Sequence, residues 1–196
     1  MNTKPDYNQL YEIAESQAGY FTAAQARNVG LSWERLSMNV KTGKFLRVVQ
    51  GVYRLAHFPN SAFEDLFVAW LKSGANSVIS HESALVVYNL SDVLPAEVHV
   101  IVPRTASRRH TGIHMHTNQL RPDEITHREG LPVTTVARTI ADAASSHLAE
   151  EQVRMAIEEA LARGLVSPEE LHTQAKRRKG RAERIIHNAL NGEQVT

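Results

Sequence analysis

The spacing of apolar residues in the first third of the chain changes once, from a helical period to a strand period. Trp33, Leu36 and Val40 recur at i, i+3 and i+7, which predicts a helix with one buried stripe. Farther on, the period shortens to two, so residues 45–49 and 52–55 are predicted to form strands joined by a tight turn. The pattern therefore predicts a helix followed directly by a β-hairpin.

Capping residues predict a further helix before this one. Thr22 is a suitable N-cap for a helix over residues 23–29, and Gly30 suits the left-handed position at its end. Ser32 then caps the helix that carries the apolar stripe. Helix, turn, helix and hairpin is the order of a winged helix-turn-helix, which places one helix in a DNA groove. The alternative is a small helical scaffold whose hairpin serves protein contacts.

The charges of this region favour DNA binding. Among residues 1–58, seven Lys and Arg residues oppose four carboxylates, a net charge of +3. Four of the seven cations lie between Lys41 and Arg54, where phosphates would meet the helix end and the wing. Arg35 and Asn39 lie opposite the predicted apolar stripe, so we expect them to read base edges. The predicted phosphate contacts are Lys41, Lys44 and Arg47.

Composition narrows the class of protein. The chain has 196 residues and is 42% hydrophobic, enough to bury a core in one domain or two small ones. A net charge of +1 excludes a protein that coats DNA by charge alone, and the lack of cysteine excludes disulfides and thiolate sites. Residues 1–9 are polar, and no run approaches the roughly 18 apolar residues of a membrane span, so we expect a cytoplasmic protein without membrane contacts.

The second part of the chain predicts a separate domain. Residues 57–60 break the hairpin, because proline cannot continue a central strand. We therefore expect a winged helix-turn-helix over residues 1–58 and a helix-rich α+β domain with a small sheet over residues 59–196. Its predicted strands are residues 97–103 and 113–117, joined by a basic loop at 104–109, and a short strand after Gly130 that ends at a helix capped by Thr134 or Thr135. Its predicted helices are residues 62–72, 81–88, a helix from 136, residues 150–162, a helix after Ser167, and residues 175–190.

Histidines gather around two of these strands. His114 and His116 point to the same face of one strand, with His110 and His99 nearby, and imidazoles so placed are typical of metal ligands. No acidic pair completes the site, since Asp123 and its neighbour lie in another segment. We therefore predict exposed histidines, no metal and no cofactor.

No catalytic residue is predicted. Thr139 and Asp142 are not accompanied by a nucleophile and base, so a helix-capping or buried hydrogen-bonding role is favoured over catalysis. The chain also lacks a glycine-rich phosphate loop.

A basic run near the C-terminus has more than one interpretation. Such a run is usually a solvated helix face, but in a DNA-binding protein it also adds phosphate contacts, and it suits an acidic partner such as a toxin surface, or RNA. Its six cations are Lys176, Arg177, Arg178, Lys179, Arg181 and Arg184, opposed by Glu183.

Two motifs together suggest a family. Residues 43–53 follow the wing pattern G-x-L/F-x-R-V-x-x-G-V-Y, and residues 130–142 follow G-x-P-V-T-x-x-x-x-T-x-x-D. With both motifs in this order, the whole chain resembles the AbiEi family, the antitoxins and transcriptional regulators of the AbiE type IV toxin-antitoxin systems. Some relatives carry a nuclease-like domain after the second motif. The sequence ends at Thr196, too soon for such a domain, so the resemblance implies a stand-alone regulator.

The resemblance also implies a function. Such antitoxins bind inverted repeats in their own promoter, repress the operon, and counteract a nucleotidyltransferase-like toxin through the C-terminal domain, with direct toxin contact not general. The alternatives are a winged-helix regulator with a sensing or dimerising second domain and no toxin, and a metal-dependent nuclease. The DNA contacts that the resemblance implies are Ser32, Arg35, Asn39, Lys41, Lys44 and Arg47.

Overall fold

A computed structural model describes residues 5–104 and 110–192 of the chain. Most of the predicted basic loop, residues 105–109, lies outside the described residues. The chain divides into two compact units, Met1–Ala75 and Asn76–Thr196. Together they combine helices with small sheets, so the predicted α+β class is confirmed.

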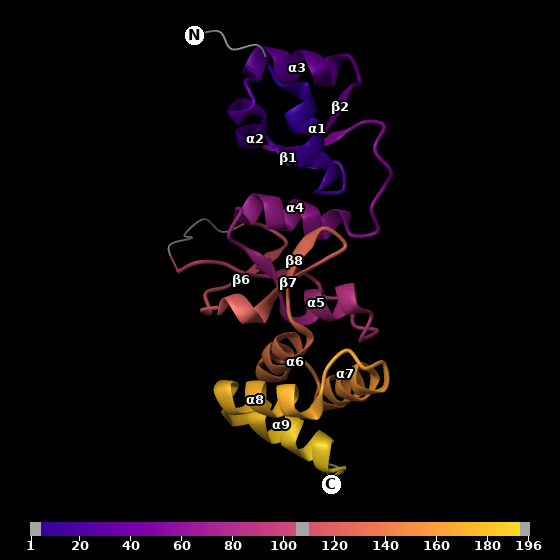
Figure 1. Cartoon of the computed structure of the whole chain (residues 1–196), viewed down its shortest axis with the longest axis vertical. Coiled ribbons are helices and arrows are strands. Elements are labelled where there is room, and N and C mark those ends of the chain that lie inside the picture. The colour runs from indigo at the N-terminus through magenta and orange to yellow at the C-terminus, as the bar shows by residue number, and fades with distance from the viewer. Residues whose placement is uncertain (1–4, 105–109, 193–196) are drawn as a thin grey trace. The chain divides into compact units, whose positions relative to one another are not determined.

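The first unit is a winged helix-turn-helix, as predicted. Its three strands form an antiparallel sheet in the order β1-β3-β2, and the wing is the β2–β3 hairpin (Figure 1). The first helix and the first strand were not predicted. The elements of this unit are α1 (Tyr7–Glu15), β1 (Tyr20–Thr22), α2 (Ala23–Asn28), α3 (Trp33–Lys41), β2 (Phe45–Val49), β3 (Val52–Leu55) and α4 (Glu64–Ser73).

Local capping starts the two central helices where the sequence predicts. The Thr22 side chain accepts a hydrogen bond from the Gln25 backbone N–H, and the Gln25 side chain accepts one from the Thr22 N–H. Ser32 Oγ accepts the Arg35 N–H at the start of α3. Inside, the Phe21 ring packs edge-on against Phe45 with 5.0 Å between centroids, so the hairpin is anchored to the helices.

The first unit continues past the predicted domain boundary. The ring of Phe67 on α4 stacks on Tyr20 at 5.4 Å between centroids. Upstream of α4, Phe58 packs so tightly on Gly19 that a Cβ at that glycine would lie 2.6 Å from it. The compact unit therefore ends at Ala75, after α4. A boundary at residues 58 and 59 between independently folding domains stays a prediction.

The second unit is built on a five-stranded sheet in the order β6-β5-β4-β8-β7. The β4–β8 and β5–β6 pairs are parallel, and the β4–β5 and β7–β8 pairs are antiparallel. The sequence predicts β5, β6 and β8 but not β4 or β7. The strands are β4 (Val78–Ile79), β5 (Val98–Ile101), β6 (Ile113–His116), β7 (Ile125–Arg128) and β8 (Leu131–Thr134), with a 3₁₀ turn, η1 (Pro122–Glu124), before β7.

Helices complete the second unit. The last two run side by side and both pack on α6, which itself packs on α5 (Figure 1). A single helix was predicted over residues 175–190, but the helix ends at Arg178, because Lys179 and Gly180 adopt φ of 61° and 59°. The helices are α5 (His81–Tyr88), α6 (Val136–Ser145), α7 (Glu150–Ala162), α8 (Pro168–Arg178) and α9 (Gly180–Asn191). No helix in the described part of the chain is long and apolar enough to cross a membrane.

The second sequence motif is a buried structural element. The Thr134 and Thr139 hydroxyls lie 2.7 Å apart, and Thr139 Oγ1 also donates to the Thr134 carbonyl. Arg138 Nε donates to both oxygens of Asp142, while Arg178 Nη2 lies 2.7 Å from the same carboxylate. Burial raises the pKa of Asp142, although the two guanidinium groups oppose the rise. The hydrogen-bonding role predicted for Thr139 and Asp142 matches these contacts.

Removal of the Asp142 carboxylate tests how much it stabilises the fold. Asp142→Ala should lower the free energy of unfolding by about 3 to 5 kcal/mol, because Arg178 loses its carboxylate partner and Arg138 keeps only Glu124. The measurement is urea denaturation of the full chain. Arg154→Ala is the control: it removes an exposed ion pair with Glu151 and should cost at most about 1 kcal/mol. Equal losses in the two variants would contradict the assignment.

Candidate nucleic-acid interface

Helix α3, the predicted recognition helix, buries a different face from the one predicted. Leu36 is buried, but so is Asn39, at 7% exposed, whereas Trp33 is 53% exposed. The Asn39 side-chain amide donates to Tyr7 Oη at 3.2 Å and to the Arg35 carbonyl at 2.8 Å. The predicted placement of Trp33 inside and Asn39 outside is therefore wrong. The spacing of apolar residues does not reveal that Asn39 is buried. A polar residue can be buried here because the Tyr7 hydroxyl of α1 accepts a hydrogen bond from its amide.

The exposed face of α3 carries a different set of side chains. Ser32, Arg35 and Lys41 lie on it as predicted, and Met38 is 60% exposed. Trp33 adds an aromatic ring, over which the Arg27 guanidinium lies 5.5 Å from the ring centroid. Nothing in the apolar spacing distinguishes this tryptophan from a core residue.

The wing adds exposed cations next to α3. Lys44 and Arg47 are exposed, and the turn at its tip uses Gly51 with φ of 84°. Arg54, expected among the wing cations, is buried instead. Its guanidinium donates to Asn60 Oδ1 and the Phe58 carbonyl, so it holds the chain that leaves the wing.

The charge on this surface is not neutralised by the protein. None of the four exposed cations on α3 and the wing forms an ion pair with another residue among those described. Glu34 supplies the single carboxylate in the sequence of α3. Unpaired cations beside an exposed helix suit the phosphates of a duplex. The four residues are Arg35, Lys41, Lys44 and Arg47.

The C-terminal basic run differs, because the protein itself uses most of its arginines. Arg178 pairs with Asp142, and Arg177 Nη1 lies 3.7 Å from Glu124. Arg181 donates to the carbonyls of Ala144, Ser146 and Leu148, each at 2.7 Å. Arg184 bonds Glu150 at 2.7 Å. A second electrostatic contact through this run stays a prediction, and the residues with no described ion pair are Lys176 and Lys179.

The structure brings some of the candidate histidines together. His99 and His116 converge, with 3.3 Å between His116 Nε2 and His99 Nδ1. The His114 ring stacks on both, whereas His110 belongs to no metal-compatible group among the described residues. The third member of the cluster is His81, which the sequence analysis missed because it precedes these strands by a whole helix.

The family comparison concerns the first unit. Residues 8–56 match the model of a family described as "Transcriptional regulator, AbiEi antitoxin". Over these residues the chain is similar to the AbiEi antitoxin family. The matched segment contains α2, α3 and the wing, which carry the candidate DNA contacts.

No curated protein matches the chain. Among solved structures, the crystal structure of the RV2827C protein from Mycobacterium tuberculosis is similar, with a TM-score of 0.60 and 11% sequence identity. The alignment covers 95% of this chain and 76% of that one. At this identity the likeness shows the fold alone.

Arg181 provides a test of the basic run. Arg181→Gln should lower the free energy of unfolding by about 1 to 3 kcal/mol, because three carbonyls at the C-terminal end of α6 and just beyond it lose a charged donor. Thermal or urea unfolding of the full chain measures the loss. The matched variant Lys176→Gln should stay within about 0.5 kcal/mol of the original chain. If Arg181→Gln leaves the stability unchanged, Arg181 belongs to a solvated helix face and does not stabilise the fold.

Proposed function

We propose that this AbiEi-family chain is a DNA-binding autorepressor and the antitoxin of a type IV toxin-antitoxin system. The observation that carries the proposal is the unpaired charge of Arg35, Lys41, Lys44 and Arg47 on α3 and the wing, within the segment that matches the family. In this proposal α3 enters the major groove of an operator with inverted repeats, and the wing follows the adjacent phosphates. The protein acts as a cytoplasmic regulator and not as an enzyme.

The side chains of α3 and the wing have different roles in the proposed complex with DNA. Arg35 lies on the exposed face one turn into α3, where a guanidinium donates to guanine O6 and N7. Lys41, Lys44 and Arg47 lie where the helix meets the wing, a position that suits phosphate oxygens. Asn39 stays among the proposed contacts only if binding frees its amide from Tyr7, so its first role is to join α3 to α1.

The second unit is proposed to counteract a nucleotidyltransferase-like toxin, with direct contact left to experiment. A winged-helix regulator without a toxin is the second candidate, because the family match ends at residue 56 and does not include this unit. Co-expression with the toxin gene separates the two. The antitoxin proposal predicts that the full chain rescues cells from growth arrest by the toxin. If the chain does not rescue cells from any cognate toxin, the second candidate is supported.

Base reading by Arg35 has a direct test. Arg35→Ala should weaken binding to the operator by about 1 to 3 kcal/mol, because a donor pair to a base edge is lost. The exposed side chain supports no described contact in the fold, so thermal stability should not change. Gel-shift titration measures the affinity. Arg154→Ala, which removes the same charge from α7, is the control; an equal loss in both variants would show a net-charge effect and no base reading.

Phosphate contacts have a different signature. Lys44→Ala and Arg47→Ala should each weaken binding to operator and unrelated DNA alike, and each should reduce the slope of log affinity against log salt by roughly one unit. Titrations at several salt concentrations measure both quantities. A loss confined to the operator, with the slope unchanged, would assign these residues to base contacts.

A further inference from the structure

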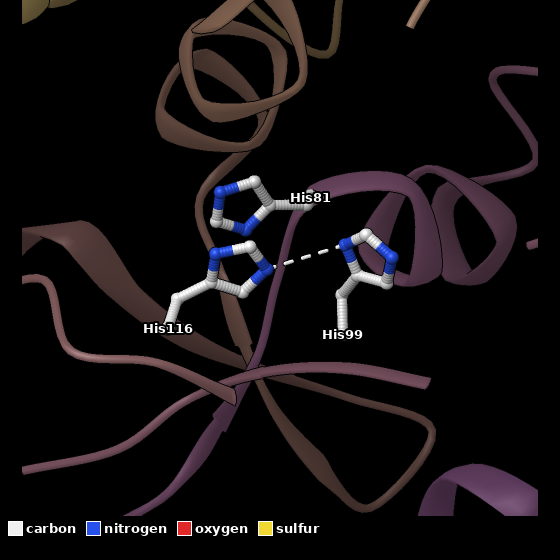
Figure 2. Close-up of side chains that lie close together, drawn as sticks. All are labelled: His81, His99 and His116. Carbon is white, nitrogen blue, oxygen red and sulfur yellow. Dashed lines mark hydrogen bonds between the residues drawn. The ribbon is translucent and has the colours of Figure 1, made fainter. Parts of the chain in front are cut away.

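Three histidines from separate elements of the second unit meet at one point. His81 lies at the start of α5, His99 on β5 and His116 on β6 (Figure 2). One ring nitrogen from each lies within 4.8 Å of the others, and no other such metal-compatible group occurs among the described residues. The cluster belongs to the second unit, whereas the proposed DNA contacts of α3 and the wing belong to the first.

Strand pairing explains why the rings meet. In the parallel β5–β6 pair, His99 lies opposite His114 and Ile101 lies opposite His116, so the imidazoles share one face of the sheet. The Ser80 N–H bonds the His99 carbonyl at 3.1 Å, which brings the start of α5 to the same place. There the His81 ring stacks on His116 with 3.6 Å between centroids (Figure 2).

The backbone at His81 takes an uncommon conformation. Its φ of 50° lies in the left-handed region, which residues other than glycine adopt infrequently, although histidine is among those enriched there. Such conformations persist at ligand sites because the surrounding structure imposes them. Here the side chain is buried, with 3% exposed, and Nδ1 lies 2.9 Å from Ser80 Oγ, which leaves Nε2 for another partner.

The protons of the cluster do not satisfy all of its polar atoms. His99 Nδ1 lies 3.3 Å from His116 Nε2 and 2.8 Å from Glu82 Oε2. If His116 Nε2 donates to His99 Nδ1, buried Glu82 Oε2 receives no hydrogen bond. One hydrogen on Nδ1 cannot point at both neighbours. A cation between the lone pairs and the carboxylate would satisfy all of them.

Burial also changes the pKa values of this cluster. It is the main reason that the pKa of His81 falls to about 2 and that of His116 to about 4. Burial raises the pKa of Glu82, but hydrogen bonds from His99 and Ser146 outweigh it and lower that pKa to about 2. The positive charge of Arg178 also lowers the pKa of His81 and of His116. Arg178 itself forms an ion pair with Asp142 at 2.7 Å.

We propose that His81, His99 and His116 bind one divalent transition-metal ion of the Zn²⁺ class, with the Glu82 carboxylate balancing its charge. Imidazole nitrogens 2.0–2.1 Å from tetrahedral zinc lie roughly 3.3 Å apart, the spacing that His99 and His116 already have. The third ring nitrogen, from His81, lies within 4.8 Å of the other two. The ion ties the start of α5 to β5 and β6. The earlier expectation of no metal rested on the absence of an acidic pair, and the buried Glu82 replaces that pair.

The test uses the full chain without an affinity tag, stripped with a chelator. Titration with Zn²⁺ in a calorimeter should show one site per chain, and Zn²⁺ should raise the melting temperature. Co²⁺ should give the intense visible absorption of a tetrahedral site. His116→Gln should weaken Zn²⁺ binding by more than roughly tenfold, and Glu82→Gln should also weaken it, by about 10- to 100-fold. No one-to-one binding by the original chain would overturn the proposal.

A matched control separates this site from adventitious histidine binding. His172 and His187 form another ring pair, 6.1 Å between centroids, so His187→Gln removes a histidine without touching the cluster. Its Zn²⁺ affinity should equal that of the original chain, and an equal loss in His187→Gln and His116→Gln would overturn the proposal. If His116→Gln does not fold, side-chain ¹H–¹⁵N spectra of the original chain decide. Zn²⁺ should shift the His81, His99 and His116 ring signals, and shifts confined to other histidines would refute the site.

Discussion

Two buried carboxylates determine where the arginines of the second unit lie. Asp142, with no exposed surface, takes Arg138 and Arg178, and Glu124 takes Arg138 at 2.8 Å. Unpaired buried charges are costly, so α6, α8 and the 3₁₀ turn before β7 must meet where these groups can pair. The packing of α8 on α6 depends on this network. In the basic run near the C-terminus the network occupies Arg177 and Arg178, whereas Arg181 and Arg184 bond to backbone carbonyls and to Glu150.

The winged helix shows the opposite arrangement. Arg35, Lys41, Lys44 and Arg47 have no carboxylate partner among the described residues, and a net charge of +1 gives the whole chain no general attraction for DNA. The attraction must therefore be local. Arg54 illustrates the distinction, because two hydrogen bonds bury it in the first unit although its sequence position suggests the wing surface. Paired arginines stabilise the fold, and unpaired ones are available to a partner.

Short-range features of the fold could be predicted from the sequence, and long-range ones could not. The caps at Thr22, Ser32 and Ser167 and the β2–β3 hairpin depend on neighbouring residues, and each forms as predicted. The two-residue strand β4 has no period to detect. The burial of Asn39 depends on Tyr7, 32 residues earlier in the chain, and an amide satisfied by a distant hydroxyl leaves no trace in an apolar pattern. In the candidate site, the cations were identifiable from sequence, but the exposure of Trp33 was not. The convergence of His81 with His99 and His116 required the sheet topology.

The central claim is that α3 and the wing form the DNA-binding surface. The most direct measurement is a ¹H–¹⁵N spectrum of the labelled full chain, recorded during titration with a duplex that contains its own promoter. The account predicts that signals from α3 and from the wing, including Arg35, Lys44 and Gly51, shift or broaden at stoichiometric DNA, while those of the second unit's sheet change little. Shifts confined to the second unit, or no shifts at DNA concentrations that saturate the protein, would contradict this claim.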